Sequence, residues 1–359
     1  MPDPTYTSTT STRTRRTRFV CISDTHNRTV KLPPGDVLIH AGDLTNQGSH
    51  SELSKAVQWL EKAKFEAKII VAGNHDITLD RDFYTEHGAY FHNQAPQDPS
   101  QCLSLLTSSP SVTYLAHSSA TVRLSSAAGP RTTFTVFGSP YSPRDGLWAF
   151  AYDRSTPTPS SAPAPAAALA SATASPARPA LPAAANLWSA IPLATDILVT
   201  HAPPRAHGDE CATRGRALGC EDLRRALWRV RPRLHVCGHV HEGRGAARVR
   251  WALAGRNVAW AEEGTTVWED PGRAGAKMSL VDLTGRGGGG SPLENDGAVT
   301  GRLLRVSCAC VRVRVGLSVP VGPDDVTERG SIDDTLRAWD WDREQGTCSF
   351  HLCGSSPPS

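Results

Sequence analysis

Five short polar clusters in the sequence combine carboxylate, imidazole and amide side chains, which are the usual ligands of divalent cations. None of the five contains a cysteine, so oxygen and nitrogen would be the donor atoms. Such a donor set suits Mn, Fe, Zn or Ni and disfavours a site built for sulfur-preferring metals. The clusters are Asp24-Thr25-His26, Gly42-Asp43, Gly73-Asn74-His75-Asp76, His201 and Gly238-His239-Val240-His241.

Each cluster ends a brief apolar run, and the runs lie at residues 19–24, 37–41, 68–72, 196–200 and 234–237. Continuous apolar runs of this length predict strands in a sheet that is covered on both faces. Residues two positions apart in a strand project to the same side, so Asp24 and His26 could hold one ion together. His239 and His241 could do the same or could contact two different ions.

Helical patterns alternate with these strands. Ser49 and Glu52 form a capping-box pattern ahead of apolar residues at helical spacing. A second helical pattern follows Glu221-Asp222 and stops before Pro232. Alternating strands and helices predict an α/β layered fold, in which functional groups gather at the carboxyl ends of the strands.

Taken singly, these motifs say little, because Asp-X-His pairs are usually structural or accidental. Their joint order, D-x-H, GD, GNH[ED], H and GHxH, resembles that of the calcineurin-like metallophosphoesterases, and the resemblance covers roughly residues 19–300. It is closest to the small metallophosphoesterase-domain (MPPED-type) branch. The stretches that resemble this branch are Gly238-His239-Val240-His241-Glu242-Gly243-Arg244-Gly245, His201-Ala202-Pro203-Pro204, Gly138-Ser139-Pro140-Tyr141 and residues 279–287.

The resemblance implies β-sheets flanked by helices and a site for two divalent ions (Mn, Fe, Zn, Ni or Mg) at the strand ends. A hydroxide bridging the ions would attack phosphorus, with His75 stabilising the developing charge or protonating the leaving group. Asp76 would either orient His75 or cap the next turn. The implied ligands are Asp24, His26 and His241 for the first ion, Asn74, His201 and His239 for the second, and Asp43 as the bridge.

The sequence therefore predicts a two-metal phosphoesterase for a small phosphodiester or phosphomonoester, such as a nucleotide or cyclic nucleotide. A metal-stabilised nucleotide-binding or scaffold protein with negligible turnover is the alternative. A serine/threonine protein phosphatase would carry Asp-Arg-Gly shortly after Gly42-Asp43, where this chain has Leu44-Thr45-Asn46. Four arginines and one aspartate in residues 1–18 account for the whole formal net charge of +3, which disfavours a nucleic-acid partner for the folded body.

Composition predicts a disordered basic tail at 1–18. The resemblance implies a metallophosphoesterase domain at 19–300, beyond which residues 301–359 form a C-terminal extension of uncertain fold. Residues 155–185, rich in Ala and Pro, predict a flexible insertion. Alternating Val and Arg at 311–315 predict an edge strand. No apolar run approaches the roughly 18 residues of a membrane span. Nine cysteines without a paired framework predict reduced thiols, so a cytoplasmic protein without a membrane partner is expected.

Several residues outside the metal motifs allow two interpretations. Tyr141 and Trp148 could form an aromatic wall for a nucleobase or could simply pack in the core. His40 and His235 lie within apolar strands and are expected to be core residues. Other histidines, His207 among them, fit no ligand spacing and are expected at the surface or in loops.

Overall fold

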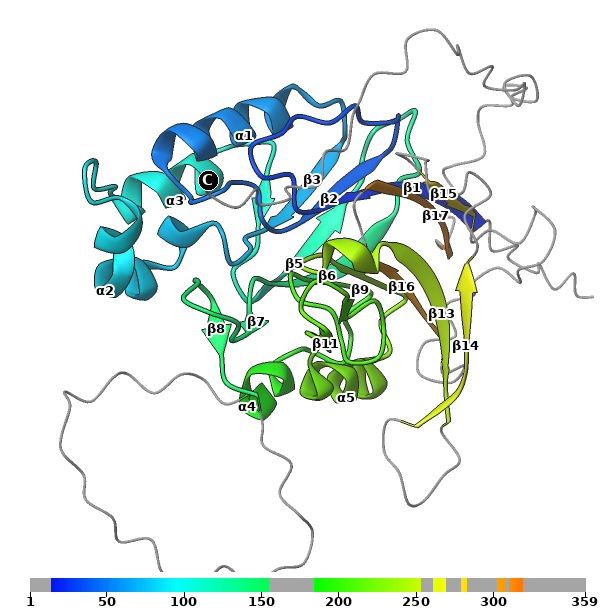
Figure 1. Cartoon of the computed structure of the whole chain (residues 1–359). Helices are drawn as coiled ribbons and strands as arrows, with labels where there is room; N and C mark the ends of the chain where they lie inside the picture. The colour runs from blue at the N-terminus through cyan, green and yellow to red at the C-terminus, as the bar shows by residue number, and fades with distance from the viewer. Residues whose placement is uncertain are drawn as a thin grey trace, which may run out of the picture. The chain divides into compact units, whose positions relative to one another are not determined.

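Two β-sheets form the centre of the protein (Figure 1). The structure, a computed structural model, describes residues 14–154, 184–252, 261–268, 279–282, 302–307 and 310–318. The first sheet has the order β15-β17-β1-β2-β3-β4, and its strands are Ser279–Asp282, Cys310–Ser318, Thr14–Ile22, Val37–Ala41, Ala67–Val71 and Thr113–Tyr114. The run from β1 to β4 is parallel.

The second sheet has the order β14-β13-β16-β12-β9-β6-β5. Its strands are Glu262–Trp268, Gly245–Trp251, Arg302–Ser307, Leu234–Cys237, Ile197–Thr200, Thr133–Ser139 and Ser118–Arg123. The middle strands β16, β12, β9 and β6 are parallel to one another. All five strands expected ahead of the polar clusters are therefore present, divided between the two sheets as β1, β2 and β3 and as β9 and β12.

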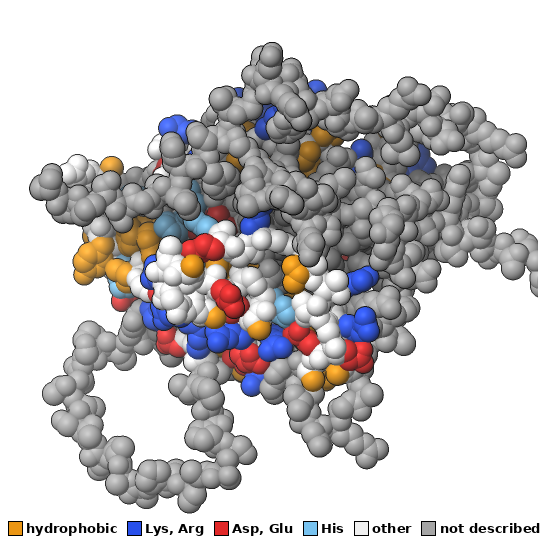
Figure 2. All heavy atoms as spheres, turned by 45° about the vertical axis from the view of Figure 1, so that its right-hand side comes forward, with side chains coloured by type: hydrophobic (Ala, Val, Ile, Leu, Met, Phe, Trp, Pro, Cys, Tyr) orange, Lys and Arg blue, Asp and Glu red, His pale blue; other side chains and the backbone are white. Residues whose placement is uncertain are grey.

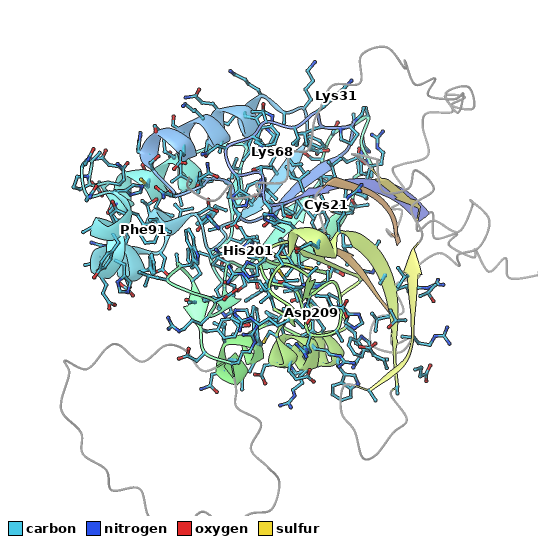
Figure 3. All side chains as sticks on the ribbon, viewed as in Figure 1. Cys21, Lys31, Lys68, Phe91, His201 and Asp209 are labelled. Carbon is cyan, nitrogen blue, oxygen red and sulfur yellow. The ribbon has the colours of Figure 1, made fainter. Side chains whose placement is uncertain are left out.

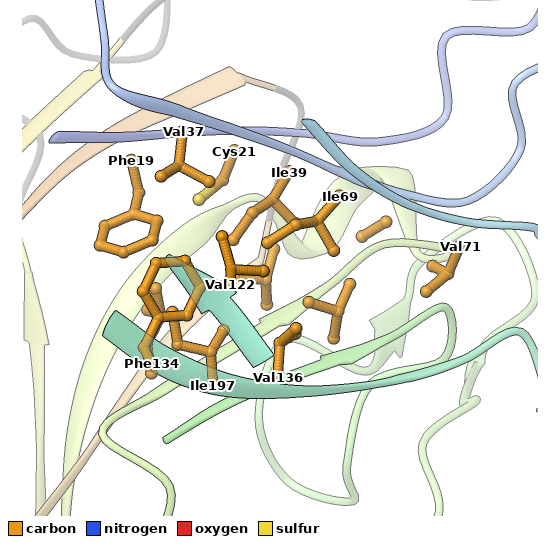
Figure 4. Packing of buried hydrophobic residues seen from close by; sticks show 14 of the residues in the cluster. Phe19, Cys21, Val37, Ile39, Ile69, Val71, Val122, Phe134, Val136 and Ile197 are labelled. Atoms are coloured by element: carbon orange, nitrogen blue, oxygen red, sulfur yellow. The ribbon is translucent and has the colours of Figure 1, made fainter. Parts of the chain in front are cut away.

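The two sheets pack face to face through one apolar core (Figure 4). Phe19 and Ile39 of the first sheet lie against Phe134, Val136 and Ile197 of the second, and all of them are buried. The rings of Phe19 and Phe134 meet edge to face with their centroids 5.5 Å apart. Because both sheets are also covered on their outer faces, the central strands β2, β3, β9 and β12 are buried on both sides, which explains their unbroken apolar runs.

Helices cover the outer face of each sheet (Figure 1). Leu53 and Leu60 of α1 pack with Ile22 and Ile70 of the first sheet, whereas Leu227 of α5 packs in the cluster on the second. The helices are α1 His50–Lys62, α2 Arg81–Phe91, α3 Pro99–Thr107, α4 Ala184–Ser189 and α5 Glu221–Val230. The layered α/β fold expected from the sequence is confirmed. No helix of the described residues is long and apolar enough to cross a membrane.

Both expected helices begin where the sequence indicates. Ser49 is the N-cap of α1, and the capping box is complete because the Ser49 N–H donates to the Glu52 carboxylate at 2.9 Å. Helix α5 ends at Val230, and the left-handed backbone of its C-cap Arg231 (φ 51°) stops the helix just before Pro232.

The structure differs from three boundaries expected from composition. Strand β1 begins at Thr14 rather than Phe19, because residues 14–18 pair with 314–318 of β17. Ala184 and Ala185, expected in the insertion, start α4, with Ala184 buried. Strand β17 is not an edge strand, since it lies between β15 and β1. Alternating apolar and charged residues report the two faces of a strand, not whether its edges are paired. Residues 1–13, 155–183 and 319–359 lie outside the described residues.

A partly buried ion-pair cluster ties β14 to α5. The Glu262 carboxylate accepts hydrogen bonds from His207 Nε2 at 2.7 Å, Arg224 Nε at 3.0 Å and Thr265 Oγ1 at 2.9 Å. His207 lies in a loop, one of the two positions expected for it, but its side chain is only 7 % exposed and so is not at the surface. Burial acts to raise the pKa of Glu262, but His207, Thr265 and Arg224 outweigh it and lower the pKa to about 2.

A folded-state pKa below the unfolded value contributes stability that is complete at neutral pH and is lost as the pH falls toward the folded pKa. Glu262→Gln is therefore expected to lower the free energy of unfolding by about 1–3 kcal/mol at pH 7, and by much less near pH 3. Urea denaturation at both pH values measures this difference. The matched control is Glu263→Gln, because Glu263 is the exposed neighbour of Glu262. Equal destabilisation of Glu262→Gln at both pH values would contradict the assignment.

Candidate metal centre

The five polar clusters meet where the carboxyl ends of the parallel strands come together. Asp24 follows β1, Asp43 follows β2 and Asn74 follows β3, while His201 follows β9 and His239 follows β12. The His201 side chain, labelled in Figure 3, joins the two sheets, because its Nδ1 lies 2.9 Å from the carbonyl oxygen of Ala41 at the end of β2. Two sheets thus supply one site.

The backbone at these strand ends is held in an unusual conformation. Asp24, His26, Asp43 and His239 all have positive φ angles, at 53°, 44°, 54° and 71°. Positive φ in a non-glycine residue costs about 1–3 kcal/mol and persists only where the surrounding structure imposes it. Here the loops impose it on one another: Asp24 N–H donates to the oxygen of Gly42 and His26 N–H to that of Asp43. Such conformations cluster at functional sites.

Three acceptor atoms converge around His201. The carbonyl oxygen of Ala41 can only accept, so His201 Nδ1 carries the proton in that hydrogen bond. In the neutral ring Nε2 is then an acceptor, and it lies 2.9 Å from Asn74 Oδ1 and 3.5 Å from Asp43 Oδ2. His239 Nδ1 lies 2.8 Å from the same Asn74 oxygen. Beside the ionised Asp43, a proton on His201 Nε2 stabilises these contacts when no metal is bound, and a divalent cation held by Nε2, Oδ1 and Oδ2 would take the place of that proton.

A second convergence lies around His26. Its Nδ1 donates to the carbonyl oxygen of Thr45 at 3.2 Å, which leaves Nε2 as the acceptor. That Nε2 lies 3.3 Å from His241 Nε2 and 3.7 Å from Asp43 Oδ2. His241 Nε2 also lies 3.6 Å from Asp24 Oδ1. The donor atoms of Asp24, His26 and His241 all lie within 4.8 Å of one another, as a metal site requires.

Asp43 belongs to both convergences. Its Oδ2 lies 3.5 Å from His201 Nε2 and 3.7 Å from His26 Nε2, while its Oδ1 accepts the backbone N–H of His75 at 2.9 Å. Burial alone would raise the pKa of Asp43, but His201, His75 and His26 outweigh burial and lower it. The ionised Asp43 and Asp24 in turn raise the pKa of His201 to about 9, against its burial. The field at this place therefore favours positive charge, so the residues fit divalent cations.

His75 lies beside these ligand atoms. Its Nδ1 donates to the carbonyl oxygen of Asn46 at 2.8 Å, and its ring meets that of His26 edge to face at 4.8 Å. A donor atom of His75 also lies within 4.8 Å of donor atoms of His26 and Asp43. His75 is therefore close enough either to act on a bound phosphate ester or to bind an ion itself.

Asp76 has neither of the two roles expected from the sequence. Its fully buried carboxylate accepts hydrogen bonds from the backbone N–H groups of Gly73, Leu44 and Thr45 and from the Thr45 hydroxyl. It makes no side-chain cap of the following 3-10 helix, and the described hydrogen bonds of the His75 side chain do not include it. Asp76 instead binds the loop that carries Asp43 to the loop that carries Asn74, thereby setting the separation of these ligands.

Two buried histidines support the site from behind. His40 and His235 are fully buried, as predicted. His40 Nε2 lies 2.9 Å from the hydroxyl of Thr25, and His235 Nε2 lies 2.8 Å from that of Thr200. Because each threonine adjoins a candidate ligand, these contacts orient the ligand loops. The sequence identified both histidines as core residues but gave no sign of their threonine partners.

Comparison with known proteins agrees with this geometry. The sequence profile of the calcineurin-like phosphoesterase family matches residues 17–243. The chain belongs to this family.

The individual relatives carry different names, and two of them are metallophosphoesterase domain-containing proteins. The chain is 36% identical over 239 residues to "Metallophosphoesterase domain-containing protein 1" of Homo sapiens and of Mus musculus, covering 64% of this chain and 62% of each relative. It is 38% identical over 253 residues to "Probable rhamnogalacturonate lyase C" of Emericella nidulans, covering 70% of this chain but 20% of that protein. A UPF0046 protein of Caenorhabditis elegans is 31% identical over 237 residues, covering 64% of this chain and 52% of that protein. The chain thus spans between a fifth and about two thirds of these relatives.

Proposed function

We propose that this protein is a two-metal-dependent phosphoesterase that hydrolyses a small phosphodiester or phosphomonoester, such as a nucleotide or cyclic nucleotide. The observation that carries the proposal is the position of Asp43 Oδ2 between His201 Nε2 and His26 Nε2, at 3.5 and 3.7 Å. A carboxylate there can contribute an oxygen to each of two cations. Family membership supports the same chemistry.

Each ion in this proposal has its own ligand set beside the shared Asp43. Divalent ions bound there would lower the pKa of a bound water and supply the attacking hydroxide. His75 is held by its Nδ1–H to Asn46, and in the doubly protonated ring the Nε2–H would stabilise the leaving oxygen or give it a proton, leaving the neutral ring. The first set is Asp24, His26 and His241 and the second is Asn74, His201 and His239.

We further propose that the substrate is a small molecule, with no nucleic acid or membrane as partner, and that the protein acts in the cytoplasm. Arg15, Arg16 and Arg18 belong to β1, and residues 14–359 carry a formal net charge of only +3, a small excess for a protein that binds nucleic acid. Five cysteines of the described residues, Cys21, Cys102, Cys211, Cys220 and Cys237, are free thiols, as is usual in a reducing compartment.

The test is metal-dependent hydrolysis of bis-p-nitrophenyl phosphate. Full-length protein is stripped of metal with a chelator and reconstituted in turn with Mn, Mg, Ni and Zn, while calorimetry counts the ions bound. We expect no activity without metal, activity with at least one of them, and two ions per chain. Tight binding of two ions without turnover would overturn the enzyme and favour the alternative, a metal-stabilised nucleotide-binding or scaffold protein.

A further inference from the structure

The His75 ring makes its closest ring contact with Trp148. The two ring centroids lie 3.9 Å apart with their planes at 34°. Trp148 lies between β7 (Ser142–Pro143) and β8 (Ala151–Tyr152), far along the chain from the loop of His75. The imidazole is thus fixed by the Asn46 carbonyl at Nδ1, by the edge contact with His26 and by the indole of Trp148.

Trp148 is itself held in place. The next residue, Ala149, donates its N–H to the carbonyl oxygen of Asn74, and Phe150 donates its N–H to the carboxylate of Asp80 at 2.7 Å. Asp80 also caps α2, so the segment is anchored to that helix. Phe91, labelled on α2 in Figure 3, packs against the indole at 5.5 Å. The half-buried Trp148 ring therefore belongs to the apolar layer over the first sheet.

The rings of this arrangement are partly exposed, because His75, Trp148, Phe91 and Phe83 are all of intermediate burial. Figure 2 shows histidine side chains exposed beside a group of hydrophobic ones on one face. The ring contacts run from His75 through Trp148 and Phe91 to Phe83. Since Trp148 packs on rings of the protein itself, its observed contacts favour a role toward His75 over a wall for a nucleobase.

We propose that Trp148 is a positioning residue, whose indole fixes the His75 ring beside Asp43 and His26 for leaving-group assistance. The role rests on the proposed function, because His75 assists only if a phosphoester is cleaved. A side chain locked by packing keeps the geometry on which proton transfer depends, and a displacement of about 1 Å can cost a hundredfold in rate. Loss of the indole should therefore reduce kcat through His75 without weakening substrate binding.

The contact itself is tested by NMR on the full-length zinc-loaded protein. Ring protons of His75, assigned with His75→Ala, should be shifted upfield by the indole. The shift should disappear in Trp148→Leu and persist in part in Trp148→Phe. Unshifted His75 protons in the wild type would overturn the proposal without any reference to activity.

The role is tested with two esters, bis-p-nitrophenyl phosphate, whose leaving group departs easily, and diphenyl phosphate, whose leaving group needs protonation. Trp148→Leu should lower kcat on diphenyl phosphate at least about tenfold, with KM unchanged and a smaller loss on the nitrophenyl ester. Trp148→Phe should recover most of the rate. In a His75→Ala background Trp148→Leu should cause no further loss of kcat, because both substitutions remove the same assistance to the leaving group.

Phe83→Leu is the matched control, because Phe83 lies in the same aromatic layer and has no ring contact with His75 among the described residues. A raised KM, or losses that add in the double variant, would show that Trp148 contacts substrate and would overturn the positioning role. If the wild type is active and Trp148→Leu has the same kcat on both esters, the positioning role of Trp148 is overturned and the proposed function is not. Wild type inactive on both esters would overturn the proposed function and this role together.

Discussion

Asp43→Asn is expected to lower kcat/KM for bis-p-nitrophenyl phosphate by at least about a hundredfold. The Asp43 side chain is 3 % exposed, and its Oδ2 faces both His201 and His26. An amide keeps the shape but removes the negative charge and cannot give the same oxygen to two cations. Calorimetry should therefore count one ion or fewer per chain where the wild type binds two.

The matched control for this charge removal is Asp153→Asn. The Asp153 carboxylate is 70 % exposed and pairs with Arg144 at the surface, where an ion pair contributes little. Thermal unfolding in chelator shows whether Asp43→Asn still folds, because Asp43 also accepts the His75 N–H. A folded Asp43→Asn variant with two bound ions and near-normal rate would contradict the bridging role.

The candidate ligands could be predicted from sequence because the relevant information is local. A short apolar run followed by Asp-X-His or Gly-Asn-His-Asp places the polar residues at the end of a strand, whichever sheet holds it. The division of the strands between two sheets was not visible, because a strand buried in a sandwich and one buried between helices have the same apolar pattern. The prediction of the site does not depend on this assignment, because the parallel strands of both sheets have their carboxyl ends at the same place.

The contacts that organise the ligands could not be predicted, because their partners are distant in sequence. Asp76 binds Leu44 and Thr45, more than 30 positions earlier, and nothing near Asp76 indicates them. Trp148 lies in a loop whose composition does not indicate a neighbour in His75. Strand β17 completes the first sheet beside β1 from the far end of the sequence. Motifs locate reactive groups, whereas the three-dimensional fold supplies the residues that hold them.

His75→Ala is expected to lower kcat on diphenyl phosphate by about a hundred- to a thousandfold, the usual value of a positioned general acid. The loss on bis-p-nitrophenyl phosphate should be smaller, because that leaving group needs little help. Two ions should still bind, since the Nδ1–H of His75 is engaged with Asn46 and the other candidate ligands remain. Steady-state kinetics on both esters and calorimetry on the same samples measure all three quantities.

This result separates two roles that the geometry allows for His75. A donor atom of His75 lies within 4.8 Å of donor atoms of His26 and Asp43, so the ring could instead be an ion ligand. Loss of an ion ligand would weaken ion binding and lower the rates of hydrolysis of both esters equally. Loss of a general acid would leave the ions bound and would mainly lower the rate for the ester with the poor leaving group. His87→Ala on α2, which packs on Phe83, is the matched histidine control and should alter neither quantity. An equal loss on both esters with fewer bound ions would therefore make His75 a ligand, and the leaving oxygen would then depend on another group.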